Sequence, residues 1–139
     1  MLNHDARSLV ASIIDRRFVF CGGKGGVGKT SIAAALGMVA ARAGRTVRVI
    51  STDPAHSLGD VFECRLDHRP TRVEAGLEAV ELDPDKCMDA YLDEVARRLR
   101  DYVKPALYGE IDRQMEQARH SPGAAEAALL EEIAGILAG

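Results

Sequence analysis

The sequence lacks most features that mark secreted, membrane-spanning or nucleic-acid-binding proteins. Its three cysteines, Cys21, Cys64 and Cys87, lie far apart and form no Cys-x-x-Cys pair, which argues against a disulfide framework and a zinc site. No apolar run reaches the roughly 18–20 residues of a membrane helix, and the first residues lack the order of a signal peptide. The formal net charge of -3 predicts no basic surface for nucleic acid. We therefore expect a cytoplasmic protein without a nucleic-acid partner.

What is present is the composition of a globular protein. The 139 residues are 47% hydrophobic, enough for a domain with its own core. Compact apolar runs at 18–21, 47–52 and 77–82 predict three strands, and the alanine-rich stretch 30–43 predicts a helix. Strand, loop, helix and strand in this order form a βαβ unit, so we predict an α/β fold with a parallel sheet. Residues 64–73 read as irregular.

The second half of the chain is predicted to be helical. Apolar residues keep the spacing of one helical face over 88–103, and Pro105 should end or kink that helix. Further helices are predicted over 108–119 and 124–137, and a short amphipathic helix over 5–15. We therefore divide the chain into an α/β core over 1–84, a helical segment over 85–120, and a helix within 121–139 that is expected to return to the core.

A phosphate-binding loop follows the first predicted strand. It has the pattern Gly-x4-Gly-Lys-[Ser/Thr] and opens the predicted helix, the context that this motif requires. Its glycines let backbone N–H groups converge on phosphate oxygens, and the helix N-terminus adds further donors. Lys29 is placed for the β- and γ-phosphates, Thr30 for Mg²⁺ and Ser31 for the α-phosphate. The predicted ATP-binding residues are Gly23, Lys24, Gly25, Gly26, Val27, Gly28, Lys29, Thr30 and Ser31.

A second lysine within the loop has two interpretations. Lys24 is either a solvated loop residue or a functional charge, and an ordinary phosphate loop does not need it. Gly-Lys-Gly-Gly-Val-Gly-Lys-Thr resembles the deviant Walker A loop, whose extra lysine reaches the nucleotide of a partner subunit. This resemblance implies that Lys24 is catalytic across a homodimer.

The segment after the second predicted strand narrows the resemblance to one family. Residues 51–62, Ser-Thr-Asp-Pro-Ala-His-Ser-Leu-Gly-Asp-Val-Phe, closely resemble the first switch of the arsenite-pump (ArsA-type) ATPases and of the ATPases that target tail-anchored membrane proteins. Residues 82–84 and 121–126 resemble later segments, so the resemblance covers nearly the whole chain. It implies a P-loop NTPase with an incomplete parallel sheet, flanking helices and part of a helical subdomain. It also implies Mg-dependent ATP hydrolysis coupled to membrane-protein targeting or to an anion or arsenite efflux pump, with a membrane client or pump subunit as partner.

Asp53 is the candidate catalytic carboxylate. It follows a strand at the carboxyl end, where open α/β sheets bind ligands, and the resemblance implies that it activates the attacking water. The alternative is that Asp53 caps a short helix over 57–62. Asp60 is a weaker candidate, and His56 is expected to order the loop.

The chain also departs from the family pattern. The second switch, an apolar strand ending in Asp-Thr-Ala-Pro, does not occur in the sequence, which predicts an N-terminal fragment with little or no hydrolysis of its own. Metalloid-binding members carry a cysteine near the segment matching 123–126, and this chain has none there. Two other functions stay open: a nucleotide-binding adaptor without turnover, and a partition-type ATPase, which would bind DNA. The apolar stripe over 88–115 is either core or a client groove.

Overall fold

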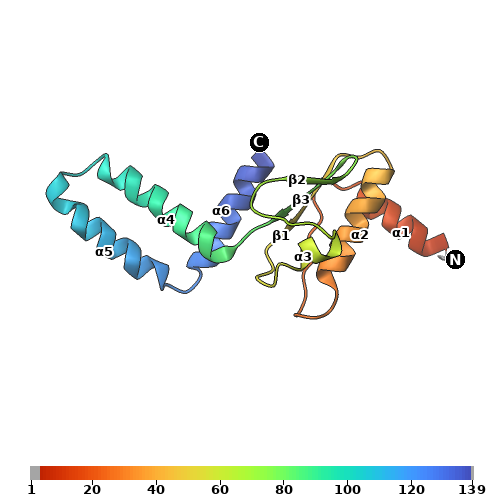
Figure 1. The fold of residues 1–139 in the computed structure, drawn as a ribbon, viewed down its shortest axis with the longest axis horizontal. Helices are drawn as coiled ribbons and strands as arrows, with labels where there is room; N and C mark the ends of the chain where they lie inside the picture. The colour runs from red at the N-terminus through yellow and green to blue at the C-terminus, as the bar shows by residue number, and fades with distance from the viewer. Residues whose placement is uncertain (1–3, 139) are drawn as a thin grey trace. The chain divides into compact units, whose positions relative to one another are not determined.

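The computed structural model describes residues 4–138 of the chain (Figure 1). Residues up to Glu81 form one compact unit, and residues from Leu82 form a second. Both helices and strands are present, as the α/β prediction requires. No helix within the described range is long and apolar enough to cross a membrane.

The first unit combines a small sheet with three helices. Its elements are α1 (His4–Ile14), α2 (Lys29–Arg42), β1 (Val47–Ser51), α3 (Ser57–Val61), β2 (Thr71–Glu74) and β3 (Leu77–Glu81). The strand order is β1-β3-β2. β1 and β3 are parallel, with Val47 opposite Leu77 and Ser51 opposite Glu81, whereas β2 runs antiparallel to β3. The sheet is therefore mixed, and the prediction of a parallel sheet holds only for β1 and β3.

The core of this unit lies between α2, α3 and the sheet. Alternate positions of β3 point inward, and α2 approaches β1 closely because Gly37 has no side chain. A Cβ on Gly37 would lie 2.6 Å from Cγ2 of Val49, which is too close for any real contact. The buried cluster consists of Ala34, Ala41, Val49, Leu58, Leu66, Leu77 and Ala79.

The strand predicted over 18–21 is wrong. These residues have an irregular backbone, and Phe18, Val19 and Phe20 are 47%, 49% and 84% exposed. A strand is stable only when a neighbour pairs its backbone, and the sheet within residues 4–138 consists of β1, β2 and β3 alone. The βαβ unit expected from this run is therefore not formed in the described part of the chain.

The strand β2 was expected to be irregular. Thr71–Glu74 is four residues long and carries too little apolar alternation to be recognised by itself. It forms because the chain reverses at Gly76, whose φ of +77° suits glycine, and lays Thr71 beside Ala79. The pairing with β3 determines this strand more than its own sequence does.

The second unit is helical, as predicted. It contains α4 (Pro84–Arg100), the 3₁₀ turn η1 (Pro105–Leu107), α5 (Tyr108–Arg119) and α6 (Ala124–Ala138). Both α5 and α6 pack against α4. The helix predicted over 88–103 ends earlier, at Arg100, and Tyr102 beyond it is 88% exposed. α4 begins at Pro84 because the Asp83 carboxylate accepts hydrogen bonds from the backbone N–H groups of Asp85 and Lys86.

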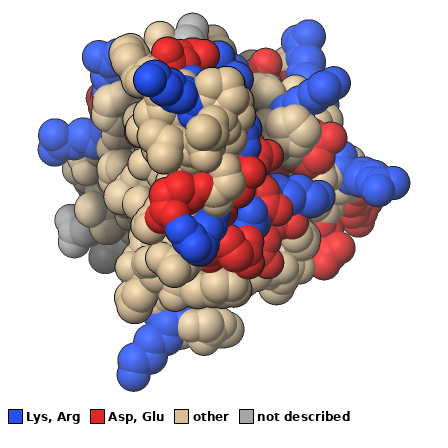
Figure 2. Space-filling model, turned by 90° about the vertical axis from the view of Figure 1, so that its left-hand side faces the viewer, with Lys and Arg blue, Asp and Glu red and all other residues tan. Residues whose placement is uncertain are grey.

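Charged side chains hold the antiparallel pair of helices α4 and α5 together near both ends. Arg119 of α5 pairs with Asp89, and Arg100 of α4 pairs with Asp112. The space-filling view shows acidic and basic side chains interspersed over the face it presents (Figure 2). Charges of both signs therefore share this face.

Candidate functional site

The glycine-rich loop before α2 takes a backbone course that depends on two of its glycines. Gly26 and Gly28 have φ values of +75° and +84°, in the left-handed region that other residues rarely adopt. A Cβ at either position would meet nothing within 4 Å. The backbone conformation, and not lack of space, is therefore the reason for glycine at these positions.

The loop leads directly into the N-terminus of α2. Gly28 immediately precedes the helix and has no side chain with which to cap it, so N–H groups of the first turn are left for another acceptor. Lys29, the first helical residue, folds back over the loop, and its Nζ donates a hydrogen bond of 2.8 Å to the carbonyl of Lys24. An open helix N-terminus with an adjacent ammonium group suits an anionic ligand.

The second segment of the site turns sharply at the end of β1. The Asp53 N–H donates to Oγ of Ser51 at 3.2 Å, and Oδ1 of Asp53 accepts from the Ala55 N–H at 3.0 Å. The carbonyl of Asp53 accepts from the His56 N–H at 3.0 Å. These bonds fix the Asp53 side chain within a local turn, which leaves Oδ2 for another partner.

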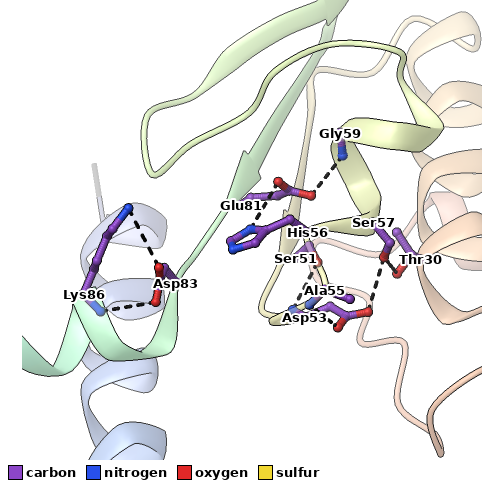
Figure 3. A network of polar contacts seen from close by, with 10 residues as sticks. All are labelled: Thr30, Ser51, Asp53, Ala55, His56, Ser57, Gly59, Glu81, Asp83 and Lys86. Atoms are coloured by element: carbon purple, nitrogen blue, oxygen red, sulfur yellow. Dashed lines mark hydrogen bonds and ion pairs between the residues drawn. The ribbon is translucent and has the colours of Figure 1, made fainter.

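The two segments meet through hydroxyl groups (Figure 3). Oγ of Ser57, the first residue of α3, lies 3.0 Å from Oγ1 of Thr30 and 3.3 Å from Oδ2 of Asp53. One proton arrangement satisfies both contacts: Thr30 donates to Ser57, and Ser57 donates to the carboxylate. All three side chains are half-buried. The fold thus joins the loop to a carboxylate 23 positions beyond Thr30 in the sequence.

The oxygen donors at this junction fit Mg²⁺ with a phosphate ligand. Mg²⁺ favours oxygen, and it usually takes one or two protein ligands and completes its shell with phosphate oxygens and water. Thr30, Ser57 and Asp53 offer two hydroxyls and one carboxylate. Within the described residues there is no cluster of three or more His, Cys, Asp or Glu that would form a closed protein cage. The residues present therefore fit Mg²⁺ bound together with a nucleotide.

The comparison with known protein families agrees with this geometry. The family model described as anion-transporting ATPase matches residues 16–138, most of the chain. The chain belongs to this family.

Members of the family that resemble this chain carry two kinds of names. This chain is 34% identical over 122 residues to an arsenical pump-driving ATPase of Acidiphilium multivorum. The matched region covers 86% of this chain and 20% of that protein. The chain is 37% identical over 92 residues to ATPase GET3 of Malassezia globosa, covering 63% and 28% respectively. It is 43% identical over 70 residues to ATPase ASNA1 homolog 1 of Paramecium tetraurelia, covering 49% and 21%. The chain thus spans between a fifth and three tenths of these relatives' lengths.

Three other predicted site residues of this family member lie at the surface of the chain. The side chains of Lys24, Ser31 and Asp60 are exposed. The residue that precedes α3 is His56 and not Asp53, so the alternative of Asp53 as a simple helix cap does not describe its place in the fold. His56 has a left-handed backbone with a φ of +52°.

Glu81 was missed when the sequence was considered alone. It ends β3, its side chain is 4% exposed, and it lies against the segment that carries Asp53. The available signal was an acidic residue at an inward position of a strand otherwise lined by Leu77 and Ala79, which indicates a buried partner.

Proposed function

We propose that this chain forms a MgATP-binding site in a P-loop NTPase fold, and that the full-length family protein hydrolyses ATP. The contact of Ser57 with both Thr30 and Asp53 supports this most. It joins the phosphate loop to a carboxylate at the carboxyl end of a parallel strand, where nucleotide sites of open sheets lie. Membership of a family of ATPases agrees with it.

In this proposal each residue at the junction has a separate task. Lys29 and the N-terminal amides of α2 would bind the phosphate oxygens, and the hydroxyls of Thr30 and Ser57 would hold Mg²⁺. Bound Mg²⁺ supplies neutralisation of the phosphate charge. Asp53 orients the attacking water and accepts its proton. Its anchoring by Ala55 and Ser57 keeps the carboxylate near the loop.

Lys24 is proposed to act on the nucleotide of a second subunit. Its side chain is exposed, whereas the Nζ of Lys29 donates a hydrogen bond within its own loop. A charge supplied in trans is worth about 10³–10⁵ in rate in comparable enzymes. The proposal therefore includes a homodimer.

The coupled process is proposed at a coarser level. One relative's name refers to driving an arsenical pump, and others are named GET3 and ASNA1, the branch expected to target membrane proteins. We propose that hydrolysis serves an anion or arsenite efflux pump or the targeting of membrane proteins, with a pump subunit or membrane client as partner. The three free thiols support a cytoplasmic location.

Binding of a fluorescent ADP analogue to this chain, with Mg²⁺ present, tests the site. Lys29→Ala should weaken binding at least tenfold because the charge nearest the phosphates is lost. Lys104→Ala, an exposed lysine of the second unit, is the matched control and should bind as the wild type does. Equal affinity of Lys29→Ala and wild type would contradict the proposed site.

Turnover separates an ATPase from a nucleotide-dependent adaptor. The adaptor is a second candidate because the contacts of Ser57 with Thr30 and Asp53 suit nucleotide binding with or without turnover. In the full-length protein, Asp53→Asn should bind nucleotide within about twofold of wild type and lose at least about 10²-fold in phosphate release. Phosphate release unchanged by Asp53→Asn would remove the catalytic assignment, and its absence in wild type would favour the adaptor.

A further inference from the structure

Glu81 is a buried carboxylate that lies beside the candidate site without belonging to it. Its side chain is 4% exposed at the end of β3. A carboxylate in such a place is unfavourable unless hydrogen bonds or a positive partner compensate for the lost water. The groups that replace water around the Glu81 carboxylate show which segment of the chain depends on this residue.

Both oxygens of Glu81 contact the segment that follows Asp53. Oε1 accepts a 2.9 Å hydrogen bond from the backbone N–H of Gly59, and Oε2 lies 3.4 Å from Nδ1 of His56. Figure 3 shows the carboxylate between these two partners. One side chain from β3 thus holds the residue before α3 and the first turn of α3 itself. We call this arrangement of Glu81, His56 and Gly59 the carboxylate clasp.

The segment from His56 through α3 is not stable in this conformation by itself. α3 has five residues, far fewer than an isolated helix needs, and a short helix leaves N–H groups of its first turn without partners. His56 has a φ of +52°, a backbone conformation that is unfavourable for a residue with a side chain. The clasp supplies an acceptor for the helix and a partner for the strained residue.

Close packing at Gly59 holds α3 against the chain that follows it. A Cβ on Gly59 would lie 2.8 Å from the carbonyl oxygen of Cys64 and 3.7 Å from Oε2 of Glu81. The contact that excludes a side chain is the one with the Cys64 carbonyl, so glycine lets α3 lie against the chain that follows it, whereas the distance to Glu81 would be an ordinary contact. Ser57, which touches Thr30 and Asp53, lies between the two clasped residues.

We propose that Glu81 is a positioning residue for the nucleotide site. Its clasp on His56 and Gly59 sets the course of the chain from Asp53 to α3 and so places the Ser57 hydroxyl between Thr30 and Asp53. The inference rests on the proposed MgATP site, because positioning matters only if the junction binds Mg²⁺ with a nucleotide. Glu81 itself touches neither.

The first test examines the clasp without any ligand. Amide hydrogen exchange of residues 56–62 is measured in the unliganded chain. Glu81→Ala should speed exchange of the Gly59 amide at least tenfold, because its acceptor is gone, whereas Glu81→Gln retains an oxygen acceptor and should keep most of the protection. Glu78→Ala is the matched control, since Glu78 is three positions earlier on β3 and pairs with Arg48 at the surface. Its exchange in α3 should match the wild type.

The second test asks whether the clasp serves the site. Affinity for a fluorescent ADP analogue is measured with Mg²⁺ and with EDTA. Glu81→Ala should weaken binding at least fivefold with Mg²⁺ and less than twofold in EDTA, and Glu81→Gln should restore most of the Mg²⁺-dependent part. Loss of stability alone would weaken both conditions equally. Unchanged Mg²⁺-dependent affinity in Glu81→Ala overturns the proposal, as does an equal loss in both conditions.

One further variant keeps the inference testable if Glu81→Ala does not fold. His56→Gly retains the left-handed backbone but removes one partner of the carboxylate, and it should lower the Mg²⁺-dependent affinity about threefold. Glu81→Gln, which has a side chain of the same shape and retains an oxygen acceptor, provides the comparison for affinity. If His56→Gly binds with Mg²⁺ as wild type does, the positioning role is wrong. If wild type binds no nucleotide, the proposed function fails separately, while hydrogen exchange still reports whether the clasp exists.

Discussion

At the scale of single residues, Gly37 sets the distance between α2 and the sheet. In Gly37→Ala the new Cβ would lie 2.6 Å from Cγ2 of Val49 and 3.3 Å from Cδ1 of Leu77. Both neighbours belong to the buried cluster or its strands, so the crowding cannot be relieved into solvent. We expect a loss of about 1–3 kcal/mol in the free energy of unfolding, measured by urea denaturation.

The matched control is another glycine inside a helix. A Cβ on Gly135 of α6 would meet nothing within 4 Å, so Gly135→Ala should leave stability unchanged or raise it by up to about 1 kcal/mol through helix propensity. A stability of Gly37→Ala equal to that of wild type would show that α2 moves away from β1 without cost.

Individual site residues differed in how far the sequence revealed them. Lys29 and Thr30 belong to a short motif whose meaning is local, and Asp53 follows directly from a strand end, so all three were predicted. Ser57 and Glu81 were missed as site residues, because their importance depends on distances across the fold. No spacing rule connects Glu81 with Gly59, which lies 22 positions earlier and meets it only when β3 pairs beside β1.

At the scale of elements, the reactivity of the Cys87 thiol depends on how α6 packs against α4. Burial raises the pKa of Cys87 on α4, and the nearby carboxylates of Glu132 and Asp83 raise it further. A raised pKa lowers the fraction of Cys87 that is thiolate at a given pH, and the thiolate is the reactive form. Glu132→Gln removes one negative neighbour, so the pKa should fall and alkylation of Cys87 near pH 8 should become about twofold faster.

Iodoacetamide labelling followed by peptide mass spectrometry measures this rate at each cysteine. Glu126→Gln, another carboxylate of α6 that is not among the groups acting on Cys87, is the control and should leave the rate unchanged. If both variants react at the wild-type rate, the contact of Glu132 with this region of α4 is wrong.

Helices and strands could be predicted where the element's own sequence is enough to specify its structure. α2, α5 and α6 carry long helical patterns, and their predicted bounds differ from the observed ones by at most one residue. Strands depend on partners. The apolar run 18–21 has the stronger β sequence but lacks a paired neighbour, whereas Thr71–Glu74 pairs with β3 despite its polar sequence. The assignment of 121–139 to the nucleotide-binding core stays a prediction.

At the scale of the whole molecule, the exposed apolar segment 18–20 should govern solubility. Phe20 is 84% exposed within a short run of β-forming residues, a combination that promotes association between chains. Phe20→Ser should raise the concentration at which light scattering begins by about twofold or more, and it should change the free energy of unfolding by less than about 0.5 kcal/mol.

An isolated exposed aromatic residue provides the comparison. Tyr102 is 88% exposed but stands between Asp101 and Val103, outside any apolar run of similar strength. Tyr102→Ser should leave the onset of scattering where it is in wild type. An equal gain in both variants would mean that general surface hydrophobicity, and not the 18–20 segment, limits solubility.

The parallel pairing of β1 with β3 has a consequence for synthesis. Val47 pairs with Leu77, thirty positions later, so at about 5–20 residues per second a ribosome needs roughly 1.5–6 seconds between making the two partners. During that interval β1 has no neighbour with which to form its ladder. Because Glu81 is the last residue of the first unit, its hold on His56 and Gly59 is the final connection of that unit to become available. The newborn chain thus carries its phosphate loop for seconds before the segment bearing Asp53 is fixed beside it.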